Sequence, residues 1–199
     1  MKYEYDVKKN LLGEKRKEEL FLANDTVCML TAMLWASRSK DPSTQVGACF
    51  VNDRGRILSV GYNGAPNGWD DDDFTWKTDM EEEYNKYSYV VHGEMNAIFN
   101  YSGPLTDLRG STVFVTLFPC KNCAKHLVQA GVKKVVYLND TRKDKDNVCA
   151  KLIFSKCGVE TEKFDELNLE GFNNIEMYVN SGSEKDMAKI KKLVPENKE

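Results

Sequence analysis

The chain has 199 residues, of which 41% are hydrophobic and 30% are charged, a balance that suits one globular domain and argues against extensive disorder. Its formal net charge of -3 argues against a protein that binds a nucleic-acid polymer. The apolar runs are far shorter than the roughly 20 residues that a membrane-spanning helix needs, and no secretory signal is visible at the N-terminus, so we expect a soluble cytoplasmic protein.

The first half of the chain predicts a helix, a hairpin and a long irregular segment. Residues 20–36 carry apolar side chains at helical spacing, and Asp41-Pro42 follows their end. The apolar runs 46–51 and 57–62 flank a turn that contains glycine, which predicts a β-hairpin. Residues 63–89 read as a loop, and a loop of this length inside a domain is usually functional or disordered.

Helices and strands alternate through the second half. The expected elements are a helix at 92–100, a strand at 112–117, a helix at 120–130, a strand at 135–138, a helix at 146–156 and a strand at 159–164. Five strands interleaved with helices predict an α/β fold with one mixed sheet, antiparallel in the hairpin and parallel where helices cross over. We expect one domain over residues 1–165 and a polar C-terminal extension over 166–199.

Three residues of the types that bind zinc are spaced along this pattern. Cys120 and Cys123 lie three residues apart at the start of a predicted helix, where both thiolates can face one metal ion. Together with His92 they would give zinc three protein ligands and leave the fourth position for water, as in catalytic sites. Glu94 lies in the first turn of the helix that begins at His92, so its carboxylate could move that water's proton.

Less specific interpretations exist for each part of this pattern. A lone Cys-x-x-Cys is often a redox pair or half of a structural zinc site. His126, the only other histidine, could replace His92 as a ligand, although a plain surface or core imidazole is the simpler reading. The combination of His-x-Glu with Pro-Cys-x-x-Cys, each at the start of a predicted helix, is the signature of zinc-dependent nucleobase deaminases.

The segments His92–Ile98 and Phe118–Ala124 resemble the cytidine/deoxycytidylate deaminase superfamily. Arg38–Ala48 and Gly61–Gly68 are similar to the deoxycytidylate (dCMP) deaminases within it, and the resemblance covers roughly residues 20–165. One departure is Gly93, where the family more often has alanine. The resemblance implies a three-layer α/β/α cytidine-deaminase-like fold with a five-stranded mixed sheet.

The resemblance also implies a reaction. Zinc held by His92, Cys120 and Cys123 would activate water to attack C4 of cytosine, and Glu94 would carry the proton to N3 and then to the departing amine. The products would be dUMP, a precursor for thymidylate synthesis, and ammonia. Another free cytosine compound, such as dCTP or cytidine, is the alternative substrate.

Substrate and effector residues follow from the same resemblance. Arg38 and Lys40 could neutralise a phosphate, although cations at a helix end are also favourable in themselves. Thr44 and Asn63 are similar to family positions near the sugar and phosphate, and Phe118 could pack on the pyrimidine or belong to the core. In regulated members a loop that corresponds to Asn63, Gly64, Asn67 and Gly68 binds dCTP as activator or dTTP as inhibitor, with Mg²⁺ on the triphosphate. Such members are usually homohexamers.

Two other classes of function remain open at this point. An editing-type binder of single-stranded nucleic acid would share the zinc chemistry but needs a positive groove, and the acidic runs 70–73 and 81–83 argue against one. A structural zinc module would use the same ligands without turnover. The remaining cysteines, Cys28, Cys49, Cys149 and Cys157, lie in apolar patterns and are expected to be buried and free.

Overall fold

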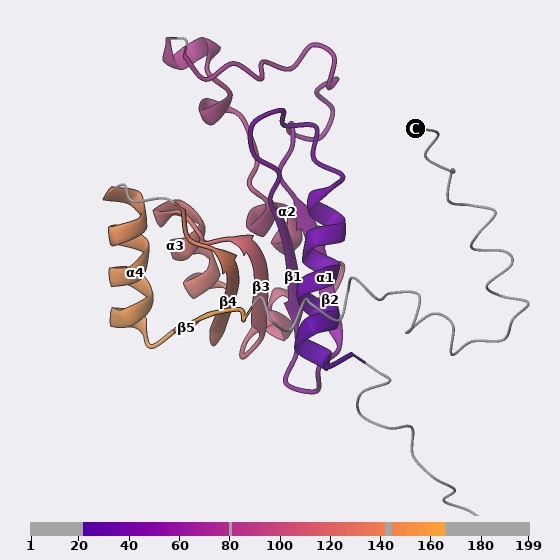
Figure 1. Cartoon of the computed structure of the whole chain (residues 1–199), viewed down its shortest axis with the longest axis vertical. Coiled ribbons are helices and arrows are strands. Elements are labelled where there is room, and N and C mark those ends of the chain that lie inside the picture. Colours follow the sequence, from indigo (N-terminus) through magenta and orange to yellow (C-terminus); the bar gives the residue numbers. More distant parts are fainter. Residues whose placement is uncertain (1–21, 80, 142–144, 166–199) are drawn as a thin grey trace, which may run out of the picture. The chain divides into compact units, whose positions relative to one another are not determined.

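The computed structural model describes residues 22–79, 81–141 and 145–165, and all of these from Asn24 onward belong to one compact unit (Figure 1). No helix within these described stretches combines the length and the apolar character that crossing a bilayer requires. The beginning of the expected 1–165 domain and the whole 166–199 extension lie outside the described residues.

A five-stranded mixed sheet forms the centre of this unit, in the order β2-β1-β3-β4-β5. The strands are β1 (Gly47–Val51), β2 (Ile57–Tyr62), β3 (Thr112–Leu117), β4 (Lys134–Asn139) and β5 (Glu160–Lys163). Strand β1 pairs antiparallel with both β2 and β3, whereas β3, β4 and β5 run parallel. The parallel part follows from the two crossover helices, α3 (Lys121–Gln129) and α4 (Lys145–Cys157).

Helix α1 (Asn24–Ala36) covers one face of the sheet. Its backbone approaches β1 so closely that a Cβ at Gly47 would lie 1.9 Å from the carbonyl oxygen of Ala32, so only glycine fits there. Trp35 on the same helix stacks on Tyr62 of β2, with ring centroids 6.0 Å apart. These contacts fix α1 against the hairpin.

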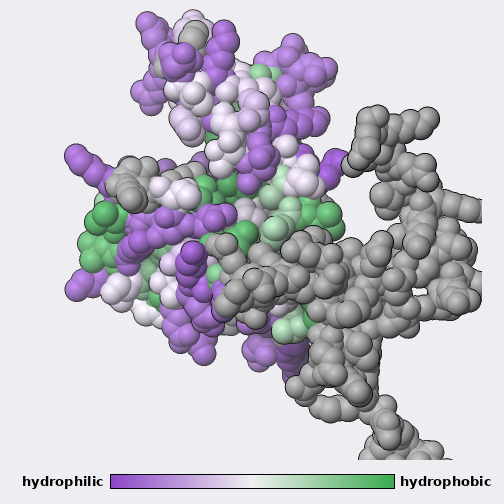
Figure 2. All heavy atoms as spheres, viewed as in Figure 1, coloured by the Kyte–Doolittle hydropathy of each residue, from purple (hydrophilic) through white to green (hydrophobic). Residues whose placement is uncertain are grey.

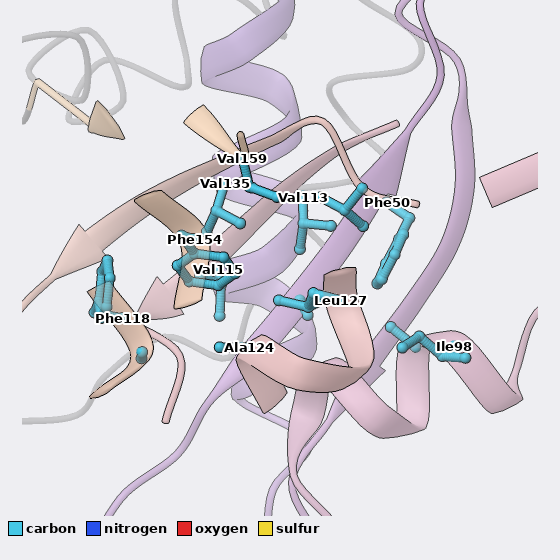
Figure 3. Packing of buried hydrophobic residues seen from close by; sticks show 14 of the residues in the cluster. Phe50, Ile98, Val113, Val115, Phe118, Ala124, Leu127, Val135, Phe154 and Val159 are labelled. Atoms are coloured by element: carbon cyan, nitrogen blue, oxygen red, sulfur yellow. The ribbon is translucent and has the colours of Figure 1, made fainter. Parts of the chain in front are cut away.

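The opposite face carries α2 (Gly93–Phe99), α3 and α4, and the main hydrophobic core lies beneath them (Figure 3). Because side chains alternate along a strand, Ala48 and Phe50 of β1 enter this core while Cys49 points to the α1 side. Leu127 of α3 and Phe154 of α4 pack onto the same surface of the sheet. The three layers are therefore α1, the sheet, and the α2–α4 layer.

The segment between β2 and α2, residues 64–91, has a small core of its own. A bridge between Gly64 and Val91 closes it at the base, and two short 3-10 turns, η3 (Glu82–Tyr84) and η4 (Lys86–Ser88), lie within it. Aromatic rings fill its centre, with Trp69 5.2 Å from Phe74 and 5.3 Å from Tyr89 between centroids. Its surface is mostly hydrophilic in Figure 2. We call this segment the insert.

The sequence-based fold prediction is confirmed in its strands, their order along the chain and the mixed sheet. Two details differ. The first helix begins at Asn24, because Leu22 and Ala23 are not helical and residues 20–21 lie outside the described part. Cys149 and Cys157 are exposed rather than buried, because α4 faces the sheet with Ala150 and Phe154 and turns these cysteines outward.

Candidate active site

Three potential metal ligands converge at the edge of the sheet where β1 begins and β2 and β3 end. His92 and Cys120 occupy the positions just before α2 and α3, and Cys123 lies in the first turn of α3. Nδ1 of His92 lies 3.5 Å from Sγ of Cys120 and 3.4 Å from Sγ of Cys123. The three ligand atoms all lie within 4.8 Å of one another. Two sulfur donors and one imidazole suit zinc, so the residues present fit that metal.

Close packing between α2 and the hairpin holds this arrangement. A Cβ at Gly61 would lie 2.5 Å from the carbonyl oxygen of Gly93, and a Cβ at Gly93 would lie 2.9 Å from that of Val46. Asn96 then donates from Nδ2 to the carbonyl oxygen of Tyr62 at 2.7 Å. Gly93 thus lies between two backbones at the start of the helix.

The pKa values of the two thiols are shifted in opposite directions. Hydrogen bonding from Cys123 lowers the pKa of Cys120 to about 3 despite its burial, and His92 adds to this effect. The same contact raises the pKa of Cys123 far above its ordinary value, with burial as the second cause. A zinc ion held here would bind both cysteines as thiolates, so metal binding would release any proton that they carry.

Glu94 lies beside these ligands with 3% of its surface exposed. Burial raises the pKa of its carboxyl group, and the neighbouring His92 opposes this shift only in part. The carboxyl group also makes a hydrogen bond with Cys123. A carboxyl group with a raised pKa next to a metal site can both accept and return a proton near neutral pH.

The site opens through two adjoining spaces. The inner cavity, of about 40 Å³, is lined by His92, Glu94 and Phe118 among others. The outer groove, of about 830 Å³, reaches past Cys120 to the end of β4. Among the described residues, four line both spaces and form what we call the rim: Thr44, Tyr87, His92 and Leu117.

The model of the cytidine and deoxycytidylate deaminase zinc-binding region matches residues 22–139, which include all three ligands and Glu94. The chain belongs to this family. The segment that matches the family model therefore contains every residue of the metal-binding set that the structure brings together.

Similar proteins of this deaminase family are found in animals and phages. A human protein named deoxycytidylate deaminase is 44% identical over 151 residues, which are 75% of this chain and 84% of that protein. A Drosophila melanogaster protein named probable deoxycytidylate deaminase is 42% identical over 76% of each chain. The dCMP deaminase of cyanophage S-TIM5, solved in complex with dCMP and dUMP, is 32% identical, with a TM-score of 0.57, over 75% of this chain and all of that chain.

Three of the five residues predicted to bind substrate line the inner cavity, namely Thr44, Asn63 and Phe118. The amide of Asn63 already has partners within the protein: Oδ1 accepts from the backbone nitrogen of Val46 at 2.8 Å, and Nδ2 donates to the carbonyl oxygen of Thr44 at 3.0 Å. Phe118 was predicted to pack on the pyrimidine or to belong to the core. Its buried ring lies 4.8 Å from that of Tyr137 between centroids, and it also lines the inner cavity.

The two predicted phosphate cations, Arg38 and Lys40, are placed elsewhere. Neither is among the described residues that line the inner cavity or the outer groove. Lys40 forms an ion pair with Asp71 of the insert. Asp71 belongs to a separate space of about 240 Å³, the loop cavity, which Gly64, Asn67 and Gly68 also line.

Sequence reasoning missed Lys86 and Asp41, which form a buried ion pair on the wall of the inner cavity. They are 45 residues apart, so no local periodicity links them. The available hint was the length of the segment 63–89, which was typical of a functional loop but did not single out a residue.

Proposed function

We propose that the chain is a zinc-dependent deoxycytidylate deaminase, which converts dCMP and water into dUMP and ammonia and so supplies dUMP for thymidylate synthesis. The observation that carries the proposal is the buried carboxyl group of Glu94 beside the convergent His92, Cys120 and Cys123. The identity of 44% with a protein named deoxycytidylate deaminase supports the choice of substrate.

In this mechanism His92, Cys120 and Cys123 would hold a zinc ion, which when bound would lower the pKa of water and supply a nucleophile near neutral pH. Glu94 would accept a proton from the attacking water at its carboxylate and pass it to N3 of the cytosine ring as the water oxygen adds to C4. Glu94 would then take the second proton from the added oxygen and deliver it to the amino group, so that the C4–N bond breaks, the C4=O bond of dUMP forms, and ammonia leaves. The wall around Glu94 keeps bulk water from competing for this proton.

The two spaces of the site support a proposed placement of the substrate. The pyrimidine ring would enter the inner cavity, where Phe118 offers an apolar wall, and the sugar and phosphate would lie toward the outer groove past Thr44. Arg38 and Lys40 remain proposed phosphate ligands. If Arg38 binds the phosphate, Arg38→Ala will lower kcat/KM for dCMP about tenfold or more while changing that for deoxycytidine much less.

A comparison of substrates tests the proposed function directly. The zinc-loaded protein should have its highest kcat/KM with dCMP, followed by dCTP, deoxycytidine and cytidine. Greater efficiency with dCTP or cytidine would replace the monophosphate assignment with the alternative free cytosine compound. Absence of turnover with all four, at full zinc occupancy, would overturn the deaminase proposal.

We also propose regulation at the loop cavity, with dCTP as activator and dTTP as inhibitor, Mg²⁺ on the triphosphate and a homohexameric assembly. Tyr62 and Gly64 line the loop cavity, whereas Asn63 between them lines the inner cavity. Gly64 also exchanges backbone hydrogen bonds of 3.0 and 2.9 Å with Val91, which precedes the ligand His92. A ligand in the loop cavity would therefore act on backbone that supports the metal site.

Titration of dCTP and dTTP into a dCMP assay, with and without Mg²⁺, tests this regulation. The expected result is a lower half-saturating dCMP concentration with dCTP and a higher one with dTTP, each requiring Mg²⁺. Light scattering in the same buffers should give six times the mass of one chain. Rates that neither triphosphate changes would overturn the regulatory proposal and leave the deaminase proposal intact.

A further inference from the structure

A charged pair is buried in the wall of the inner cavity. Nζ of Lys86 lies 2.7 Å from Oδ1 and 2.8 Å from Oδ2 of Asp41, and the two side chains expose only 2% and 3% of their surfaces. Asp41 belongs to the turn before β1 and Lys86 to η4 of the insert. The pair thus joins two segments that approach the site from different parts of the fold.

The carboxylate of Asp41 organises the turn on its side of the cavity. It accepts hydrogen bonds from the backbone nitrogens of Ser43 at 2.8 Å and Thr44 at 3.2 Å. Its second oxygen accepts from Nδ2 of Asn63 at 3.3 Å. Thr44, a member of the rim, therefore has its backbone fixed by the same carboxylate that binds Lys86.

Lys86 organises the insert in a similar way. Its backbone nitrogen donates to the carbonyl oxygen of Lys77 at 2.9 Å, and its own carbonyl oxygen accepts from the backbone nitrogens of Tyr89 and Val90. The next residue is Tyr87, which belongs to the rim although 65% of its surface is exposed. Fixing Lys86 therefore fixes the backbone that carries Tyr87.

Stability alone does not explain such a pair. Removing two charges from water costs about as much free energy as their attraction returns, and apolar side chains of similar size often stabilise a fold equally well. What an ion pair with several additional hydrogen bonds does provide is one defined geometry. Here that geometry sets the separation of two segments that each carry a rim residue, Thr44 and Tyr87.

We propose that Asp41 and Lys86 are a positioning pair that holds Thr44 and Tyr87 at the rim and thereby determines substrate binding. The inference rests on the proposed deaminase function and assigns the pair no part in proton transfer. Neither residue is one of the three metal ligands, which lie at the starts of α2 and α3. Loss of the pair should therefore raise KM for dCMP and leave zinc binding and kcat largely unchanged.

The test uses the double variant Asp41→Asn/Lys86→Met in the full-length, zinc-loaded protein. Each single change would leave a buried charge without its partner and could prevent folding, whereas the double change removes both charges at nearly constant volume. The matched control is Lys134→Met/Glu162→Gln, which removes an ion pair of 2.6 Å between β4 and β5. The measurements are zinc per chain, the urea unfolding midpoint, and kcat and KM for dCMP.

We expect KM to rise tenfold or more in the Asp41/Lys86 variant, with kcat within about threefold of wild type and one zinc per chain. The control should keep both constants within about twofold. A purely structural pair would lower the unfolding midpoint or the active fraction without moving KM, and that result would overturn the positioning role. A wild type that binds zinc but does not deaminate dCMP would overturn the proposed function, and this inference with it.

Discussion

Gly61 on β2 lies so close to α2 that a Cβ at residue 61 would be 2.3 Å from the backbone nitrogen of Ala97. No side chain can occupy that space without moving the helix or the strand. Because α2 begins next to His92 and carries Glu94 in its first turn, the geometry of the active site depends on this contact between backbones.

Gly61→Ala should therefore both destabilise the fold and weaken the metal site. Overpacking of this kind costs about 1–3 kcal/mol, and relief by displacing α2 would move His92 away from the cysteines. Urea unfolding and zinc titration of the variant measure the two effects. Gly64→Ala is the control for stability, since a Cβ there would meet only Tyr62, at an ordinary 3.8 Å. Equal stability of the two variants would contradict this prediction.

The metal ligands and Glu94 could be predicted because the sequence carries them locally. His92 and Glu94 begin one predicted helix, and Cys120 and Cys123 begin another, so periodicity and spacing were enough to place each pair. Helix α3 follows β3 almost directly, so it begins at the edge of the sheet where β3 ends. The structure brings His92 at the start of α2 to the same edge, next to Cys120 and Cys123.

The wall of the site could not be predicted in the same way. The Asp41–Lys86 pair forms because the insert contacts the turn before β1. No local sequence pattern around either residue predicts that contact. Asn63 illustrates a second limit. The resemblance places it near the sugar and phosphate, and it does line the inner cavity, but the sequence did not show that its amide also binds the backbone of Thr44 and Val46.

Glu94→Gln should abolish most turnover while retaining zinc. Glutamine keeps the shape of the side chain but cannot carry the proton, and loss of a general acid–base group typically costs about 10²–10⁴-fold in rate. Because burial raises the pKa of this carboxyl group, a neutral amide should also be tolerated in the fold. Steady-state kcat, with zinc measured on the same sample, checks the prediction. Turnover within tenfold of wild type would exclude Glu94 as the proton carrier.

Zinc binding should distinguish the two histidines in the chain. His92→Ala removes one of three convergent ligands and should weaken zinc binding about 100-fold or more, with loss of activity. His126 is exposed on α3 and is not part of the metal-binding set, so His126→Ala should bind one zinc per chain as wild type does. Competition with a chromophoric chelator gives both affinities. Retention of zinc by the His92 variant and its loss from the His126 variant would reverse the ligand assignment.

Cysteine reactivity offers a check that needs no substrate. In zinc-free protein at about pH 6, iodoacetamide should label Cys120 despite its burial, because hydrogen bonding from Cys123 lowers its pKa to about 3 and the thiolate is the reactive form. Cys28 and Cys49 should stay unlabelled, since burial raises their pKa values to about 11 and about 12. The exposed Cys149 and Cys157 serve as the internal reference for access.

Zinc should then protect Cys120 selectively. A sulfur bound to the metal is not free to attack, so labelling of Cys120 should fall at least tenfold on zinc addition while the exposed reference thiols keep their rates. Peptide mass spectrometry resolves the individual sites. Labelling of Cys120 at the same rate with and without zinc would mean that this sulfur does not bind the metal, and the three-ligand site would lose one of its members.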